Sequence, residues 1–490
     1  MTDVTLPLAE FNSPRLTRLI LKLAIPSVIG LSAHALHQIG NAFFISRLGT
    51  EAVSAISLCF PIAIILAAIG EGAGVGVSAF TSRMLGANQP EKAHQAATTV
   101  MALLGLLGIL LTLLIMPFIP TMLTKMGATP HSLELSIRYT QLIVLFAPLM
   151  LLQILCDFIA ISEGNTRFSM WTLIGSFALN LILDPIFIFT FNMGITGAAW
   201  ATGASQVAAI LAYFVYFRRR LGTVRIAPKY FKIQMTALWQ MIAVGVPAAL
   251  STGLASIAYV IMYHTAGSYG DNVVAAIGIS FRILAAGTLP VVGFCLGAQA
   301  LLGFSWGAEN IKRFRQTVNR MLGITSLFTV SYSLLVIIFA PTLIAFFTQD
   351  PTVASLAILA CRMFHLFFAF FSIHMVAVVT LQITGKAREA AWLVLAPQGY
   401  CFIPFLFLLP NSFGIHGLLA CPPIAAALST LLAGILLFKE MSALKTCASS
   451  SIPSASIPSS SIPPSSNLHN LANTSISTVN PIAALEKHPS

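Results

Sequence analysis

GEGAGVGVSAFTSRMLGANQPEKAH, residues 70–94, and VGFCLGAQALLGFSWGAENIKRFR, residues 292–315, are two versions of one pattern. In both, small residues fill an apolar run that ends in a Gly-Ala turn and a basic segment. One constant shift along the chain aligns Gly72 with Gly293 and Gly76 with Gly297 without a gap. This stretch therefore predicts a chain built from two related halves.

The same shift aligns residues far outside the opening stretch. GNTRFSMW, residues 164–171, meets GKAREAAW, residues 385–392, and a shift shorter by one position aligns GITG with GIHG. Pro, Arg and Trp are carried to equivalent positions, which chance similarity between apolar segments does not explain. Further aligned pairs are Pro26 with Pro247, Gly49 with Gly270, Phe60 with Phe281 and Gly86 with Gly307.

The composition predicts a membrane protein. Hydrophobic residues make up 57% of the 490 residues and charged residues only 8%, against about 25% charged in soluble domains. Apolar segments long enough to cross a bilayer, roughly 20 residues, recur to about residue 439. Lipid-embedded segments must satisfy their own backbone hydrogen bonds, so we expect helices. Twelve spans are predicted: 23–46, 52–80, 95–118, 136–160, 169–191, 195–217, 238–264, 273–303, 317–341, 353–382, 391–410 and 414–438.

The predicted fold class is an all-α integral membrane protein. Six spans per repeat is an even number, so both halves enter the membrane in the same direction, as two six-helix bundles related by a pseudo-two-fold axis along the membrane normal. This is a parallel-repeat plan of secondary transporters. The predicted parts are an N-terminus (1–22), an N-terminal bundle (23–217), a basic linker (218–237), a C-terminal bundle (238–438) and a tail (439–490).

The net charge of +11 reports topology. All but five of the 26 Lys and Arg residues lie on one side of the twelve spans, and the positive-inside rule makes that side cytoplasmic. Both termini are then cytoplasmic, and nucleic acid is not an expected partner. The five exceptions are Arg47, Lys125, Arg138, Arg282 and Arg362.

The cysteines and the C-terminal tail do not predict a functional site. Cysteines lie mostly inside apolar spans, as small hydrophobic side chains do, so we expect neither a disulfide framework nor a metal site, and no cofactor. From about residue 446 the chain is rich in Ser and Pro, as in SIPSASIPSSSIPPSS, residues 451–466. Such a segment cannot bury enough apolar surface to fold, so we expect it to be disordered.

Asp184 is the strongest candidate among the few ionisable residues inside the spans. In NLILDP, Asn180 and Asp184 share a helix face, and Pro185 favours a bend after the carboxylate. Thr202 and Gln206 share a face of the next span at a similar depth. Oxygen donors around one carboxylate suit a hard cation, and a buried carboxylate can instead take up a proton. The alternative is that Asp184 only hydrogen-bonds the bent backbone.

The chain resembles the multidrug and toxic compound extrusion (MATE) transporters, and more closely their DinF-like branch. The resemblance covers about residues 15–440 and rests on the order of several motifs. These motifs are IPSVIG (25–30), SRLGTEAVSAI (46–56), SRMLGANQPEKA (82–93), EGNTR (163–167), NLILDPIFIF (180–189) and GITGAAWAT (194–202).

The resemblance implies export of varied, often cationic or amphipathic compounds in exchange for Na⁺ or H⁺. In that family Asn180, Asp184 and Thr202 match the cation site. Many members carry an acidic residue where this chain has Asn41. Asn41 offers an oxygen but neither charge nor a proton, which leaves the choice between Na⁺ and H⁺ open.

Other membrane-embedded polar residues are weaker candidates for binding substrate or protons. Glu71 is expected to face a cavity of the N-terminal bundle, or to be a protonated glutamate bonded inside it. Arg282 could bind an anionic substrate, pair with an acid or reach the interface, and His264 could carry protons. Gln206 belongs with the oxygen donors near Asp184.

The sequence leaves rival functions open. A flippase for a lipid-linked precursor is the nearest, and a polytopic membrane enzyme is the second, although no catalytic motif is found. A channel is disfavoured by the two-bundle repeat. We expect a monomer in the plasma membrane (bacterial inner membrane), with the bilayer, the coupling cation and a small-molecule substrate as its partners.

Overall fold

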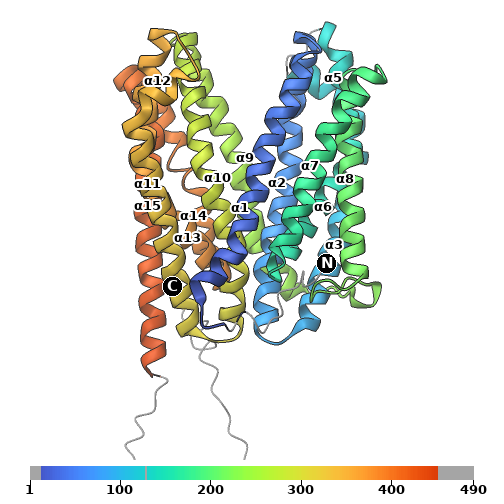
Figure 1. Ribbon diagram of the computed structural model, residues 1–490, viewed down its shortest axis with the longest axis vertical. Coiled ribbons are helices and arrows are strands. Elements are labelled where there is room, and N and C mark those ends of the chain that lie inside the picture. Colours follow the sequence, from blue (N-terminus) through green and yellow to red (C-terminus); the bar gives the residue numbers. More distant parts are fainter. Residues whose placement is uncertain (1–10, 12, 127–129, 451–490) are drawn as a thin grey trace, which may run out of the picture. The chain divides into compact units, whose positions relative to one another are not determined.

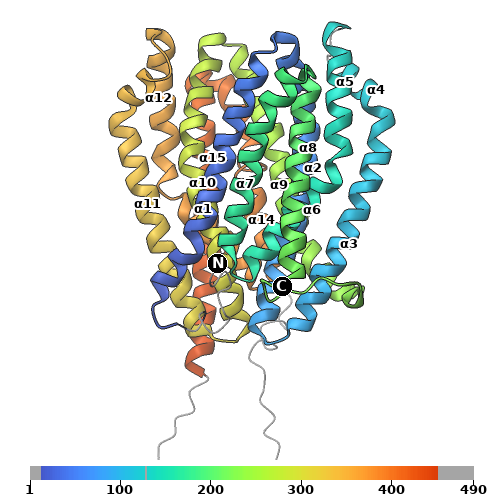
Figure 2. The same cartoon turned by 45° about the vertical axis from the view of Figure 1, so that its right-hand side comes forward.

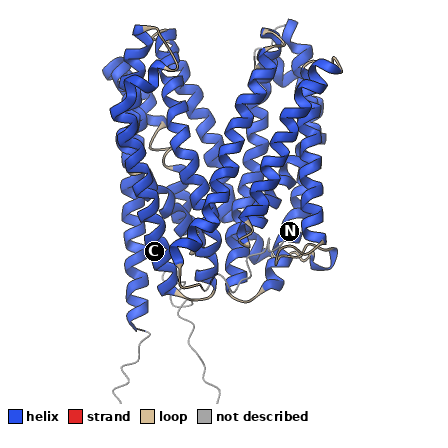
Figure 3. Cartoon of the chain, in the orientation of Figure 1, coloured by secondary structure: helices blue, strands red, loops and turns tan. Residues whose placement is uncertain are grey.

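The computed structural model describes residues 11, 13–126 and 130–450. In these residues it contains helices joined by loops and no strand (Figure 3). Of these residues, those up to Leu437 form one compact unit, and those from Phe438 onward belong to a second. The longer helices are α1 (Leu16–Ser46), α2 (Thr50–Gly86), α3 (Pro90–Ile115), α5 (Pro130–Leu145), α6 (Ala147–Ser162), α7 (Thr166–Pro185), α8 (Ile195–Arg218), α9 (Met235–Gly267), α10 (Asp271–Gly307), α11 (Ile311–Ala345), α12 (Pro351–Phe368), α13 (Phe371–Ile383) and α15 (Ile403–Ser450).

The remaining elements are short. They are the helices α4 (Ile119–Lys125) and α14 (Ala387–Leu395), the π-helical turn η3 (Ile186–Thr190) and the 3₁₀ turns η2 (Met116–Phe118) and η4 (Pro228–Tyr230).

The number of membrane-spanning helices differs from the twelve expected. Among the described residues ten helices are long and apolar enough to span, or eleven if α5 and α6, which meet at a 46° bend, form one span. Two expected spans, 391–410 and 414–438, fall on α14 and on α15, which continues through Gly414. Gly414 has φ 58° and ψ −136°, so two helices meet there with their directions changed.

Several boundaries also differ from those expected. α1 begins at Leu16, before residue 23, because Leu16, Leu19 and Ile20 extend the apolar run. α15 reaches Ser450, so the expected disorder from residue 446 does not hold for 446–450. The rest of the expected disordered tail, 451–490, lies outside the described residues.

The repeat reappears in the backbone. Every described glycine with positive φ has a counterpart in the other half: Gly49 (98°) with Gly270 (108°), Gly164 (87°) with Gly385 (79°), and Gly194 (57°) with Gly414 (58°). Asn88 and Glu309, which the repeat also aligns, both have φ 55°. The two halves of the chain therefore make the same turns at equivalent positions.

The helices of residues 1–437 form two sets, α1 to α8 and α9 to α14 with most of α15. In Figure 1 the sets come together at the end where residues 219–234 lie, which we call the linker end, and they separate toward the opposite end. Figure 2 places α3 and α11 at opposite sides, with α1, α7 and α9 between them. α2 packs against α9, α1 against α10, and α2 against α10.

Repeated glycines make these contacts possible. A Cβ on Gly76 would lie 2.3 Å from the carbonyl oxygen of Met241 on α9, and a Cβ on its counterpart Gly297 would lie 2.5 Å from that of Leu23 on α1. Nearer the linker end, a Cβ on Gly86 would meet the oxygen of Phe304 at 2.1 Å. Small residues let membrane helices approach this closely, so the glycine-rich segments 70–94 and 292–315 form the surface on which the two sets meet.

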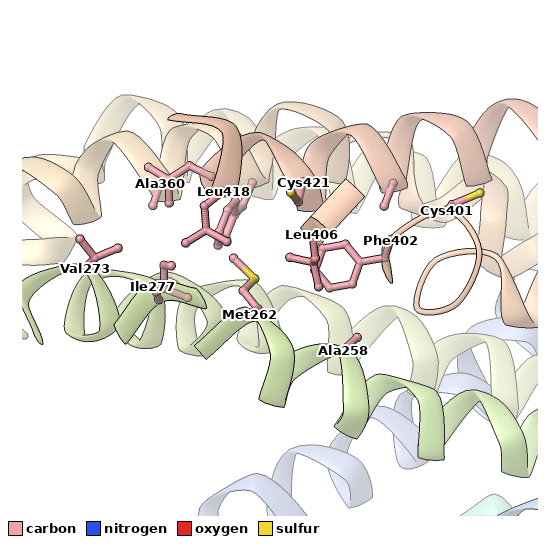
Figure 4. Close-up of a cluster of buried hydrophobic side chains, with 14 of the residues drawn as sticks. Ala258, Met262, Val273, Ile277, Ala360, Cys401, Phe402, Leu406, Leu418 and Cys421 are labelled. Carbon is pink, nitrogen blue, oxygen red and sulfur yellow. The ribbon is translucent and has the colours of Figure 1, made fainter. Parts of the chain in front are cut away.

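The second set has an apolar core of its own. Met262 of α9 and Ile277 of α10 point toward Leu418 and Cys421 of α15, as Figure 4 shows. All four side chains are buried. Packing of this kind fixes the positions of α9 and α10, which in turn contact the first set.

Candidate functional site

Asp184 lies in the last turn of α7 and is 0% exposed. The helix gives way after Pro185 to the π-helical turn η3, as expected for a proline that removes one backbone donor. Asn180, one turn earlier on the same face, is 1% exposed. A carboxylate and an amide are thus held together inside a membrane helix.

Asn180 connects three helices. In one orientation of its amide, the Asn180 nitrogen donates to Asp184 Oδ2 at 3.2 Å and to His37 Nε2 of α1 at 2.7 Å. The Asn180 oxygen then accepts from the Thr202 backbone N–H of α8 at 3.0 Å. In the opposite amide orientation it keeps contacts with His37 and with the Thr202 hydroxyl, at 2.7 and 3.3 Å. We assign the first orientation because it also gives Asp184 Oδ2 a hydrogen-bond donor.

Several buried polar atoms on the same three helices have no hydrogen-bond partner in the described residues. They are Asp184 Oδ1, Asn41 Oδ1, Gln206 Oε1 and His37 Nδ1. Buried oxygens are nearly always paired, so three unpartnered oxygens on three neighbouring helices are unusual. Carboxylate and amide oxygens are the ligands that a hard cation takes.

α1 brings His37 to Asn180 through its close contact with α7. A Cβ on Gly40 would lie 2.4 Å from Leu181 Cδ2, so the Leu181 side chain of α7 packs directly on the α1 backbone at Gly40. The His37 ring stacks on Phe177 of α7 with centroids 4.7 Å apart.

Two residues extend the expected site. His37 stands one turn from Asn41, and that four-residue spacing is the sequence signal that could have placed it here. Tyr139 of α5 is buried within electrostatic reach of Asp184, and no motif pointed to it.

The other expected site residues lie elsewhere. The Glu71 carboxylate of α2 accepts a hydrogen bond from the Thr252 hydroxyl of α9 at 3.2 Å. Glu71 therefore lies where the two sets meet, whereas the sequence placed it within the N-terminal bundle. Arg282 of α10 is exposed and within electrostatic reach of Tyr263, and His264 of α9 is exposed.

A second buried carboxyl group, Glu163, holds the linker. It directly follows α6, is 4% exposed, and accepts hydrogen bonds from the Tyr216 hydroxyl and from the Val224 backbone N–H, the latter at 2.7 Å. A Cβ on Gly222 would lie 2.1 Å from Glu163 Oε1, so a larger residue there would displace the carboxylate. Burial raises the pKa of Glu163 to about 7, although these hydrogen bonds oppose the rise.

Three further contacts tie the linker to α3. The Arg225 backbone N–H donates to His94 Nδ1 at 3.2 Å. The Lys232 N–H donates to the Thr99 hydroxyl at 3.2 Å, and Gln234 donates to Gln95 at 2.7 Å. The linker is therefore bound to the first set of helices from Val224 to Gln234.

Comparison with known families gives two matches within this chain. The MatE family model matches residues 26–186 and again residues 247–408, more than half of the chain. The chain belongs to the MatE family. The two MatE matches begin at Pro26 and at Pro247, a pair of residues that the repeat aligns.

Curated relatives extend over nearly all of this MatE protein. The multidrug export protein MepA of Staphylococcus aureus (strain MSSA476) is 28% identical over 429 residues, which is 87% of this chain and 95% of that protein. MepA of Staphylococcus haemolyticus is 27% identical over 444 residues, 90% and 98% of the two chains. Neither relative carries a DinF name.

Solved structures share the MatE fold. A multidrug resistance MATE family transporter of the MOP superfamily, in an outward-facing conformation, is 25% identical with a TM-score of 0.84, covering 90% of this chain and 99% of that one. A MOP superfamily transporter from Pyrococcus furiosus gives 25% and 0.83 over the same shares. This MatE protein is a multi-pass membrane transporter and not an enzyme.

Proposed function

We propose that this MatE protein is a secondary antiporter that exports varied, cationic or amphipathic small molecules in exchange for Na⁺ or H⁺. The relatives named multidrug export proteins support the substrate class. The observation that carries the coupling is Asp184, a fully buried carboxylate with one oxygen unpartnered among the described residues.

The proposed coupling site consists of Asp184, Asn180, Thr202 and Asn41, with Gln206 at its edge. Asp184 supplies the negative charge, and Asn41 and Gln206 supply unpartnered oxygens. Asn180 donates its amide N–H to Asp184 Oδ2, and the Thr202 backbone N–H holds the Asn180 oxygen. An ion or proton there neutralises the buried charge of Asp184. An ion that is also bound by the Asn41 oxygen holds α1 against α7 and α8. Release of the ion removes that attraction, which links occupancy to helix packing.

The proposed substrate contacts lie between the two sets of helices. Glu71 offers negative charge at the contact of α2 with α9, which suits a cation. Arg282 on α10 and His264 on α9 are exposed polar groups of the second set. We assign to these three a contribution to substrate or proton binding.

The proposed architecture has two six-helix bundles, residues 23–217 and 238–438, around a linker at 218–237. Two family matches and paired backbone angles support it. The twelve spans arise when α12 and α13 count as one span, and when α15 is divided at Gly414 with α14 added to its first part.

The proposed topology places the linker end on the cytoplasmic side. Most Lys and Arg residues fall on that side, including Arg218, Arg219 and Arg220. We assign the protein to the plasma membrane of a bacterium, as a monomer, and we keep the DinF-like branch as a proposal alongside the likeness to MepA.

The proposal is tested by transport in reconstituted vesicles. Export of a lipophilic cation is measured under an imposed Na⁺ or H⁺ gradient, for the parent protein and for Asp184→Asn. We expect gradient-driven export that the substitution lowers by about 100-fold or more, the scale of losing one well-placed charged group. The gradient that drives export identifies the ion.

Asp157→Asn is the matched control. Asp157 is also a buried carboxylate of a membrane helix, but its Oδ1 already accepts from Ser169 and Tyr213, and an asparagine oxygen can accept the same bonds. Export by Asp157→Asn should stay near the parent level. Export unaffected by Asp184→Asn would contradict the coupling site, and no export under either gradient would favour a flippase.

A further inference from the structure

A basic cavity lies at the linker end, outside the coupling site. Its volume is about 640 Å³, within the range of about 300–1,000 Å³ typical of small-molecule sites. It lies between the start of α1 and the first turns of α11, so the two sets of helices share it. Its polar lining consists of Arg15, Thr17, Arg18, Gln316, Asn319 and Arg320.

The charges in this cavity have one sign. Three guanidinium groups line it, and no Asp or Glu side chain does so among the described residues. Nor does the described part of the chain contain an ion pair of Arg15, Arg18 or Arg320. Like charges at one site repel one another unless an anion neutralises them.

The start of α1 adds to the attraction for an anion. Arg15 occupies the N-cap position without a side-chain cap, and the first turn of this 31-residue helix contains no acidic residue. The N–H groups of that turn carry a partial positive charge. Backbone donors at a helix N-terminus bind phosphate groups readily, and guanidinium groups bind them bidentately.

The cavity walls are held together by neighbouring contacts. Arg313 of α11 donates to the Ser13 backbone oxygen at 3.0 Å, which ties the segment before α1 to α11. Phe11 in the same segment packs on Phe304 of α10, with ring centroids 4.9 Å apart. These contacts hold the backbone around the cavity, and the side chains of Arg15, Arg18 and Arg320 are exposed at its mouth.

The position of the cavity favours a lipid source for the phosphate. The candidate span of α1 begins at Leu16, and after Arg18 the helix carries only one further charged residue, Lys22. The cavity thus lies at the level of the headgroups, where basic pockets between membrane helices bind anionic lipids.

We propose that the cavity formed by Arg15, Arg18 and Arg320 binds the phosphate group of an anionic phospholipid headgroup and thereby bridges α1 and α11. A soluble phosphate ester has the same chemistry, so the experiment must separate the two sources. Because the site joins the two sets at the linker end, its ligand stabilises the arrangement in which these ends are together.

The test counts bound lipids and does not depend on transport. The full-length protein is placed in nanodiscs of phosphatidylcholine with a minority of phosphatidylglycerol, and lipids retained after release are counted by native mass spectrometry. We expect the triple variant Arg15→Gln, Arg18→Gln, Arg320→Gln to lose about tenfold or more in phosphatidylglycerol retention. The control removes three charges at the same end: Arg218→Gln, Arg219→Gln, Arg220→Gln.

A charge-preserving variant controls for a change in membrane insertion caused by the loss of positive charge. Replacing the same three arginines with lysine keeps the basic balance but removes the planar forks, so we expect an intermediate loss. In a second arm, glycerol 3-phosphate is added to detergent-solubilised protein. Protection of the parent against heat, absent in the glutamine variant, would support the site with a soluble ligand.

Equal lipid retention by the glutamine variant and its control, with no protection by glycerol 3-phosphate, would overturn the proposal. Full retention by the lysine variant would overturn recognition by guanidinium groups. Since no transport is measured, failure of the antiport proposal leaves these outcomes unchanged.

Discussion

At the scale of single residues, Glu163 shows how a buried carboxyl group makes stability depend on pH. Its folded-state pKa of about 7 lies above the ordinary value of 4.5 because burial penalises the charged form. The folded state therefore holds a proton between these two values while the unfolded state releases it. This contribution is fully present below pH 4.5 and is lost as the pH rises through 7.

We predict that the protein melts at a lower temperature at pH 8 than at pH 5.5. The loss of stability from Glu163 is about 2 kcal/mol over this range. Glu163→Gln, which stays neutral, should reduce this pH dependence and should be the more stable form at pH 8. Thermal melts of detergent-purified protein at both pH values measure the effect.

An unchanged pH slope in Glu163→Gln would contradict this account of the linker anchor. Glu163→Ala serves as the second comparison, since it leaves the Tyr216 hydroxyl and the Val224 N–H without an acceptor at every pH. Its melting temperature should therefore fall at both pH values.

At the scale of helices, the glycines of the repeat act in pairs. Gly76 faces the backbone of α9 and Gly297 faces the backbone of α1, so each half presents the same glycine to the first helix of the other. Gly253, in the middle of α9, has no atom within 4 Å of where its Cβ would lie. Substitutions at Gly76 and Gly297 therefore test the close approach of two helices, and a substitution at Gly253 tests helix propensity alone.

We predict that Gly76→Ala and Gly297→Ala each destabilise the protein, by about 1–3 kcal/mol. The two losses should be similar because the contacts are related by the repeat. Gly253→Ala should leave the melting temperature unchanged or raise it, since alanine favours a helix. Thermal melts of the three variants decide this, and equal stability of all three would show that the crossings tolerate a Cβ.

At the scale of the whole molecule, the connection between the halves is made by helices. The linker is bound to the first set by Glu163 and by contacts with α3, whereas α2 with α9 and α1 with α10 form the junction. Covalent continuity at the start of α9 is therefore not what holds the halves together.

We predict that residues 1–234 and 235–490, expressed together as separate chains, associate and transport. The cut leaves the linker on the half to which it is bound. Co-purification through a tag on one chain, followed by the vesicle assay, measures the result. Each half expressed alone is the control and should not transport, because the coupling site and the Glu71 contact draw on different parts of the molecule. Failure of two well-inserted halves to associate would show that the linker joins them.

An all-helical, duplicated membrane protein could be predicted from the sequence alone, which also put Asn180 and Asp184 on one helix face and proposed Thr202 as a further oxygen donor. Those inferences depend on composition, on one constant register between the halves and on side chains one helical turn apart, all of which are local or periodic. It did not place the break between α5 and α6, because tertiary packing decides where a long apolar segment bends.

Only the tertiary structure placed His37 against Asn180, Glu71 against Thr252 and Glu163 against the linker. The partners in these pairs are from 61 to 181 residues apart, and one chain carries no local signal for such contacts. The same holds for the basic cavity, whose arginines come from two distant parts of the sequence: each alone fits the positive-inside rule, and only packing of α1 beside α11 makes them one site.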